Sequence, residues 1–223
     1  VNNMHRVAKR RRAKRLQNGS LVLTSCKLTF KLDPSTGNPA KADTYVIRES
    51  NQLVEEYMLL ANYLVAQELI LTFGDNAFLR AHDEPDTSGM KELQTVAGQL
   101  GLTMGTTSSK TVQDSLNEIT RRSSPLVVKI ITNMLTKPIP EASYRRAGED
   151  PGRWKHYALA IPYYTHFTSP IRRYPDVIVH RLLDASIQVK KHGPDSDEAK
   201  AIMEAVKDTG ATAELDQCAG HCN

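Results

Sequence analysis

Residues 51–73 read NQLVEEYMLLANYLVAQELILTF and carry the strongest helical pattern of the 223-residue chain. Apolar side chains recur there at helical spacing on one broad face, at Val54, Tyr57, Met58, Ala61, Leu64, Val65 and Leu69. Ser50 or Asn51 is placed to cap the N-terminus of this segment. The sequence therefore predicts its main helix here.

Upstream of this helix the pattern changes along the chain. Residues 4–17 have the composition of a basic helix, and Asn18-Gly19 supplies a C-cap or turn in which φ can be positive. Apolar residues then alternate with polar neighbours at Leu21, Leu23, Leu28, Phe30 and Leu32. Asp33-Pro34 to Gly37 break the chain before Tyr45, Val46 and Ile47. These signals predict a small antiparallel β region near the N-terminus.

Downstream of residue 73 the chain is predominantly helical. The expected helices are Met90 to Leu100, ended by Gly101; Thr111 to Arg122; Pro125 to Leu135, with Ser124 as N-cap; and segments near 176–190 and 196–208. Ser169 before Pro170 also has the pattern of a helix start, but Pro175 then requires either a kink or a later start. The predicted fold class is α+β, mostly helical with the small antiparallel β region.

Positive charge is unevenly placed in an otherwise ordinary globular composition of 40% hydrophobic and 24% charged residues. The formal net charge is only +4. Near the N-terminus, however, cations occur with no acid among them, at Arg6, Lys9, Arg10, Arg11, Arg12, Lys14 and Arg15. Such a block favours an acidic partner, nucleic acid first, and the alternatives are a solvated helix face or a targeting tract.

Cysteine content and hydropathy indicate the cellular compartment that the protein occupies. Cys26, Cys218 and Cys222 do not form an even disulfide framework, and no secretory segment opens the chain, so an intracellular, reducing compartment is expected. No apolar run approaches the roughly 20 residues needed to cross a bilayer, so no membrane partner is expected. The chain begins at Val1 instead of an initiator methionine, and it ends at Asn223 with no sign of a terminating structural element. We therefore expect a segment of a longer protein.

The densest chemical signal is residues 163–174, YYTHFTSPIRRY. Its rings can stack on bases and its hydroxyls can hold phosphate oxygens, while the planar forks of Arg172 and Arg173 match phosphate geometry. Contact with nucleic acid is one interpretation of this combination. The other is a packed loop in which Arg172 or Arg173 forms an internal ion pair.

This motif, followed by Asp176 and His180-Arg181-Leu182, resembles the signature of the ribonuclease II and R family, the RNB exoribonucleases. Other parts of the chain fall in the family order: His5 to Leu23, Glu49 to Asn62 and Leu79 to His82. The resemblance covers nearly the whole chain. Asp150 to Leu159 and Gly220 to Asn223 resemble the eukaryotic cytoplasmic branch, DIS-three-like exonuclease two, which implies a cytoplasmic location.

The resemblance implies processive hydrolysis of single-stranded RNA from the 3′ end, with release of nucleoside 5′-monophosphates and two magnesium ions as cofactor. The family's metal ligands are aspartates upstream of the matching segment, and no such cluster occurs here, so we assign no metal ligand. Cys218, His221 and Cys222 make a poor zinc site because a fourth ligand is lacking. We therefore expect residues 1–223 to be the C-terminal portion of one RNB catalytic domain, without flanking OB-fold domains.

The family's catalytic arginine corresponds to Arg172, where a fixed cation stabilises charge that develops on the phosphate. The functional glutamate falls in Glu55-Glu56, and we assign it to Glu56, a carboxylate that must reach solvent or pair with Arg172 or Arg173. An acid near a helix N-terminus also suits the helix dipole alone. The expected RNA contacts are Tyr164, His166, Thr168, Ser169, Arg173, Arg10, Arg11 and Arg12. Leu23 stands where bacterial relatives carry phenylalanine, so no base clamp is assigned there.

Three functions are open on this basis. The first is an exoribonuclease domain, and the second is an RNB-like protein or fragment that binds RNA without catalysis because the aspartates are lost. The third is a helical scaffold whose basic face only keeps it in solution. The upstream sequence separates the first two, and RNA binding with a steep salt dependence excludes the third.

Overall fold

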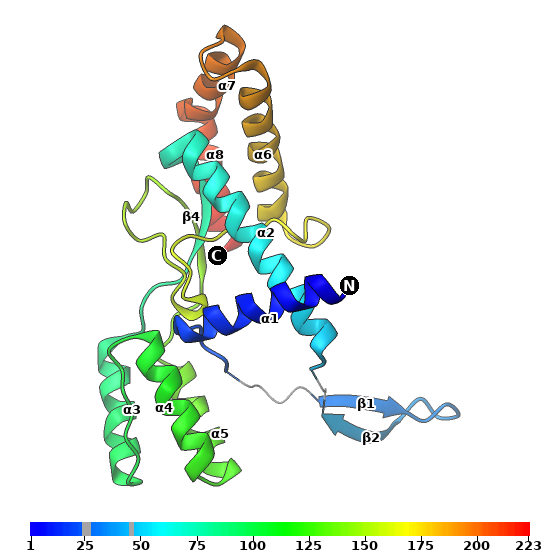
Figure 1. The fold of residues 1–223 in the computed structure, drawn as a ribbon, viewed down its shortest axis with the longest axis vertical. Coiled ribbons are helices and arrows are strands. Elements are labelled where there is room, and N and C mark those ends of the chain that lie inside the picture. Colours follow the sequence, from blue (N-terminus) through cyan, green and yellow to red (C-terminus); the bar gives the residue numbers. More distant parts are fainter. Residues whose placement is uncertain (24–27, 45–46) are drawn as a thin grey trace.

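The structure is a computed structural model that describes residues 1–23, 28–44 and 47–223. Its elements are α1 (Asn2–Gln17), β1 (Leu28–Leu32), β2 (Pro39–Thr44), α2 (Glu49–Phe73), β3 (Phe78–Ala81), α3 (Thr87–Gln99), α4 (Ser109–Arg122), α5 (Pro125–Thr136), β4 (Ser143–Arg146), α6 (Tyr174–His192), α7 (Asp197–Lys207) and α8 (Thr209–Cys222). Short 3-10 helices occupy Gly74–Asn76 and Tyr157–Leu159. Helices dominate and the sheets are small and antiparallel (Figure 1), so the predicted α+β class is confirmed.

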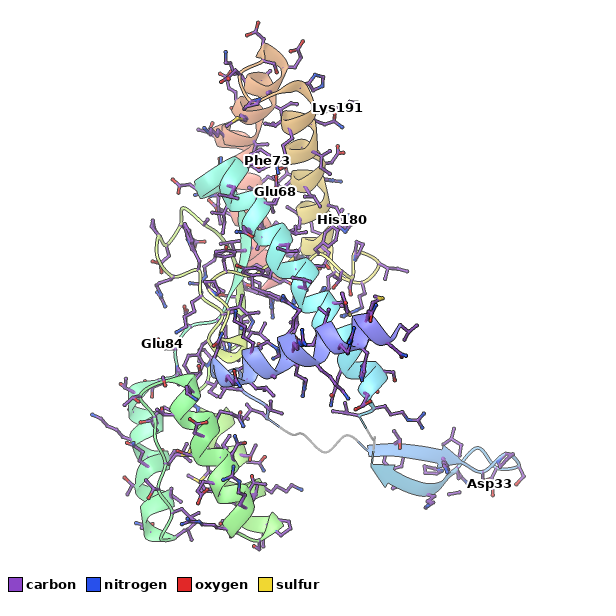
Figure 2. The ribbon with its side chains drawn as sticks, viewed as in Figure 1. Asp33, Glu68, Phe73, Glu84, His180 and Lys191 are labelled. Atoms are coloured by element: carbon purple, nitrogen blue, oxygen red, sulfur yellow. The ribbon has the colours of Figure 1, made fainter. Side chains whose placement is uncertain are left out.

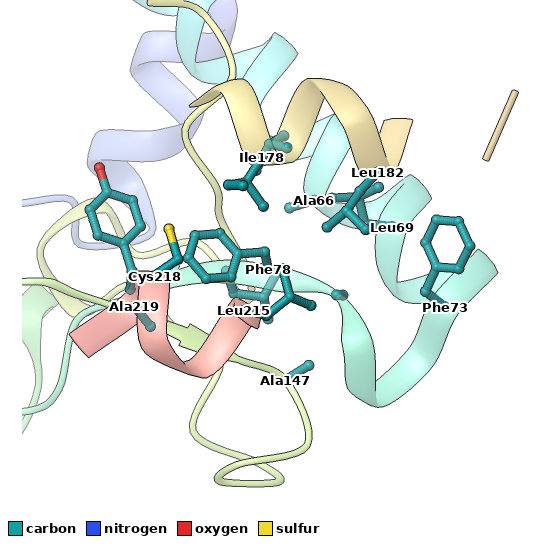
Figure 3. Packing of buried hydrophobic residues seen from close by; sticks show 14 of the residues in the cluster. Ala66, Leu69, Phe73, Phe78, Ala147, Ile178, Leu182, Leu215, Cys218 and Ala219 are labelled. Carbon is teal, nitrogen blue, oxygen red and sulfur yellow. The ribbon is translucent and has the colours of Figure 1, made fainter. Parts of the chain in front are cut away.

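The C-terminal half of α2 forms the main core. Ala66, Leu69 and Phe73 pack there with residues of β3, α6 and α8, which include Phe78, Ile178, Leu182, Leu215, Cys218 and Ala219 (Figure 3). Burial of a side chain such as Leu69 contributes roughly 1.5–3 kcal/mol. Glu68, labelled in Figure 2, accepts a hydrogen bond from Lys190 Nζ at 2.6 Å and so ties α2 to α6.

The start of α2 differs from the prediction, whereas its end at Phe73 agrees with it. The helix begins at Glu49, so neither Ser50 nor Asn51 is its N-cap; Asn51 Oδ1 instead accepts the Arg48 N–H at 2.9 Å from inside the first turn. Gly74 ends the helix with φ of 56°, a conformation that favours glycine. By length and composition the segment is apolar enough to cross a membrane, which the sequence analysis did not expect. In this structure its buried apolar residues, Val65, Ala66, Leu69 and Phe73, pack in the main core.

The sheet of β3 and β4 joins segments on either side of α3, α4 and α5, with Phe78 opposite Arg146. The sequence predicts no strand at these positions, because four-residue strands carry too short a pattern. Asn223 occupies the free side of β4, where its Oδ1 accepts the Tyr144 N–H at 2.6 Å and its Nδ2 donates to Tyr144 O at 2.8 Å. The helix α8, also unforeseen, is thereby fastened to this sheet.

The helices α3, α4 and α5 form a separate group below α1 in Figure 1, with a core of their own. Its buried residues include Leu93, Ala97, Val112, Leu116, Ile131 and Leu135. All three predicted helices are confirmed. The side chains of Asp86 and Ser108 cap α3 and α4 by accepting backbone N–H groups, and Pro125 opens α5 with Ser124 at the N-cap position.

The N-terminal elements match the prediction in part. The basic helix is confirmed as α1, and Gly19 takes φ of 97° in the turn that follows. The hairpin of β1 and β2 projects from the rest of the chain (Figure 1). Residues 21–23 are not a strand, since the Leu21 N–H bonds to Ala158 O at 2.8 Å, and the second strand begins at Pro39 instead of Tyr45. Three residues named in the predictions lie outside the described residues: Cys26, Tyr45 and Val46.

Candidate nucleic-acid interface

A groove of about 500 Å³ lies between the N-terminal half of α2 and the predicted RNA-contacting segment. Its α2 wall includes Asn51, Val54, Glu55 and Met58. The facing wall includes Tyr164, Thr168 and Arg173. Val54 and Met58 are 56% and 37% exposed and leave apolar surface open to the groove. The groove thus combines apolar surface, a hydroxyl and a guanidinium, a mixture suited to bases and phosphates.

The two adjacent arginines have different surroundings. Arg173 donates from Nε and Nη2 to Asp176 at 2.6 and 2.7 Å, a two-point ion pair. Arg172 is exposed, and within the described ranges its side chain has no hydrogen bond or ion pair. The internal ion pair anticipated for one of the two therefore belongs to Arg173. Arg172 is the guanidinium left open to a phosphate.

Asp176 organises this arrangement from the first turn of α6. It is fully buried, and its Oδ1 also accepts the Ser169 N–H at 2.7 Å. Burial acts to raise the pKa of Asp176, but the hydrogen bonds from Arg173 and Ser169 outweigh burial and hold the pKa below its ordinary value. The side chain is a carboxylate at neutral pH. Because α6 begins at Tyr174, with Pro175 in its first turn, the later of the two predicted helix starts is correct.

Tyr164 and His166 lie in a row of packed rings. Tyr164 is 5% exposed, and its hydroxyl accepts from Asn62 Nδ2 at 2.7 Å. His166 Nδ1 lies 2.6 Å from the Tyr144 hydroxyl, and its ring meets that of Tyr164 edge-on. Burial, followed by the charge of Arg173, lowers the pKa of His166 to about 3, so this ring is neutral. Tyr164 reaches the groove only with its small exposed surface.

Thr168 and Ser169 are both half-buried. Thr168 lines the groove, and its Oγ1 is buried without a hydrogen-bond partner among the described residues. A buried hydroxyl without a partner is unfavourable, so this atom is suited to a ligand oxygen or a water. Ser169 acts through its backbone N–H on Asp176. As RNA contacts the two residues stay predictions, and Thr168 is the better placed.

Glu56 lies on the side of α2 that faces α1. It is 2% exposed, and its Oε1 accepts from Arg15 Nη2 at 2.6 Å and Nε at 3.2 Å. Arg12 Nη1 is 3.8 Å from the same oxygen. The expectation that Glu56 pairs with Arg172 or Arg173 is wrong, because α1 crosses α2 and supplies the partner (Figure 1).

The predicted phosphate contacts of α1 do not share one environment. Arg12 Nη1 lies 3.4 Å from Glu55 Oε1 and is partly neutralised. Arg10 is exposed, and Arg11 borders a hollow of about 250 Å³ together with Lys14. In the part of the chain that the structure describes, none of Arg10, Arg11 and Lys14 forms an ion pair. These three cations are therefore open to an anion.

Several residues outside the expected RNA contacts hold the interface together. Asn62 Oδ1 accepts the Phe167 N–H at 2.9 Å, and the His180 ring, labelled in Figure 2, stacks on Phe167 at 4.3 Å. Arg80 Cζ lies 4.5 Å from the centre of the Tyr144 ring. Asn62 and His180 stand inside the family motifs, and their common partner Phe167 lies 105 residues from Asn62 and 13 residues from His180. No local pattern therefore reveals these contacts.

No metal centre is formed by the described residues, since no three His, Cys, Asp or Glu side chains gather to hold an ion. Cys218 and Cys222 are free, and burial raises the pKa of the Cys218 thiol to about 11, which disfavours the thiolate that binds zinc. The side chains that the structure describes do not fit a magnesium site. No catalytic step through magnesium follows from them.

Comparison with known proteins assigns the chain to a family. The RNB domain matches residues 1–189. The chain is 44% identical to DIS3-like exonuclease 2 of Xenopus tropicalis over 191 residues, 84% of this chain and 23% of that protein. It is 39% identical to inactive exonuclease DIS3L2 of Arabidopsis thaliana over 196 residues, 86% of this chain and 18% of that protein. The chain belongs to the RNB family and spans less than a quarter of these relatives.

The fold is similar to that of a part of ribonuclease R. The structure of Mycoplasma genitalium RNase R in complex with ribose-methylated single-stranded RNA matches 99% of this chain and 32% of that chain, with a TM-score of 0.77 and 24% identity. The family resemblance of residues 163–174 is thus confirmed. The family contains exonucleases, generally metal-dependent, and also inactive members. Membership supports an exoribonuclease or RNB-like RNA-binding role.

Proposed function

We propose that this chain is the C-terminal portion of the catalytic domain of a processive 3′-to-5′ exoribonuclease. The whole enzyme degrades single-stranded RNA in the cytoplasm and releases nucleoside 5′-monophosphates. Two relatives support this: the Xenopus protein is named an exonuclease, and RNase R was solved with single-stranded RNA. In this proposal the segment supplies contacts to RNA, and the aspartates that hold magnesium lie upstream of it.

The observation that carries the proposal is the difference between the two adjacent guanidinium groups. The charge of Arg173 is compensated by the buried carboxylate of Asp176, whereas Arg172 is exposed and unpaired among the residues described. A cation held beside the scissile phosphate stabilises the charge that develops in the transition state, without reorganisation at the moment of reaction. Arg172 has this role in our proposal, and the groove beside it holds the strand.

The test is Arg172→Lys in the full-length protein. Lysine keeps the charge but loses the planar two-point contact, so single-turnover degradation of a short single-stranded RNA should slow by about 10²–10³-fold. The dissociation constant for RNA should change little, because the contact matters most in the transition state. Arg181→Lys is the matched control, since Arg181 is exposed like Arg172 and lies nearby on α6.

Circular dichroism and thermal melting establish that each variant is folded. A folded Arg172→Lys protein that degrades RNA at the parent rate refutes the catalytic role. If Arg173→Lys loses a comparable factor in rate and Arg172→Lys does not, the catalytic role belongs to Arg173.

A second candidate function is RNA binding without catalysis. It is favoured by the 39% identity to a relative named as an inactive exonuclease. The two functions differ in one measurement, the magnesium-dependent release of mononucleotides by the full-length protein. RNA binding without such release, together with loss of the upstream aspartates, identifies the second.

A further inference from the structure

A single carboxylate closes the turn that carries Arg172. Asp176 is 0% exposed and accepts hydrogen bonds from the Ser169 N–H at 2.7 Å, from Arg173 Nε at 2.6 Å and from Arg173 Nη2 at 2.7 Å. Within the turn, the N–H groups of Arg172 and Arg173 lie 3.2 Å from Ser169 O. Both ends of the turn are therefore held by one side chain. Its apex faces solvent, with Ile171 97% exposed.

The carboxylate is itself fixed to the core. Asp176 stands in the first turn of α6, and the residues that follow it on this helix, Ile178 and Val179, are buried in the main core. Displacement of the turn would leave a buried charge without its partner, which is strongly unfavourable. The place of Arg172 relative to the rest of the fold is thus set through Asp176.

We propose that Asp176 is a positioning residue for catalysis, which holds residues 169–173 so that the Arg172 guanidinium stays aligned with the phosphate. This inference rests on the proposed function of Arg172. The competing explanation is that the pair of Arg173 and Asp176 only stabilises the fold. The two differ in their dependence on Arg172: a positioning effect disappears when that guanidinium is removed, and a general structural effect does not.

The experiment is a double-mutant cycle in the full-length protein. Asp176→Asn preserves shape but offers one acceptor oxygen in place of two, so one donor is left facing an amide NH₂. Single-turnover degradation of a short single-stranded RNA is measured for Asp176→Asn, Arg172→Ala and the double variant, beside equilibrium RNA binding and thermal melting. Asp184→Asn is the matched control, because Asp184 is exposed on the same helix.

Asp176→Asn should slow degradation by about 10²-fold, as a misplacement of roughly 1 Å does, with RNA affinity nearly unchanged. In the Arg172→Ala background the same substitution should change the rate by less than about twofold. Asp184→Asn should leave the rate unchanged.

Equal slowing in both backgrounds overturns the positioning role and leaves the proposed function intact. A parent rate in folded Asp176→Asn also overturns it. A parent rate in Arg172→Ala overturns the catalytic role proposed for Arg172, on which this inference rests. If Asp176→Asn does not fold, Arg173→Lys takes its place, since it keeps the charge and loses the two-point contact. Arg173→Lys should slow degradation less than is expected for Asp176→Asn. Slowing that occurs only when Arg172 is present supports positioning. Slowing that is equal in the Arg172→Ala background refutes positioning.

Discussion

The ion pair of Glu56 and Arg15 predicts how strongly α1 is attached to α2. Glu56 is 2% exposed and the Arg15 side chain 11%, with Glu56 Oε1 at 2.6 Å from Arg15 Nη2. Arg15→Ala leaves the carboxylate buried without its main partner, and breaking a buried pair in this way costs about 3–5 kcal/mol. Arg12 Nη1, 3.8 Å from the same oxygen, compensates in part. We therefore expect a loss at the lower end of this range, about 3 kcal/mol, in the free energy of unfolding.

The assay is urea unfolding of the chain, followed by circular dichroism. Glu55 is 44% exposed, so Glu55→Gln should cost less than about 1 kcal/mol. Replacing Arg15 and Glu56 together by methionine should recover most of the stability lost in Arg15→Ala, because no unpaired charge stays buried. The reasoning is refuted if Arg15→Ala destabilises the chain no more than Arg12→Ala does.

Three further outcomes are expected. Exchange of Arg10, Arg11 and Arg12 for glutamine should weaken binding of all RNA sequences alike and flatten its salt dependence, whereas an unchanged slope assigns these residues to a solvated face. Burial lowers the pKa of His156 and His166 from 6.5 to about 3, so between these values protons bind mainly to the unfolded chain. Stability should therefore fall as the pH drops through this window, with up to about 1.4 kcal/mol per pH unit from the more buried His156, and a flat profile in urea unfolding contradicts this. The 223-residue chain alone should show no nuclease activity with magnesium, because its described residues offer no group to hold the ion; robust release of mononucleotides is the contrary result.

Helices and family membership follow from local signals in the chain. The helical spacing of apolar residues in 51–73 predicts α2, and the predicted start lies two residues from the observed one. The spacing is a local signal because helical hydrogen bonds join residues only four apart. Helix propensity and the Asn18-Gly19 turn likewise predict α1 and its end. The stretch of residues 163–174 concentrates enough distinctive chemistry to identify the RNB family.

The contacts that give the interface its chemistry depend on elements far apart in sequence. Glu56 finds its partner 41 residues away on α1, and β3 pairs with β4 across three intervening helices. Arg172 and Arg173 have identical side chains and stand four and three residues before Asp176, so side-chain type and spacing do not decide which of them pairs with it. They differ in the structure because α6 packs against the core and buries Asp176 within reach of Arg173. The carboxylate of Asp176 compensates the charge of Arg173, and Arg172 stays exposed.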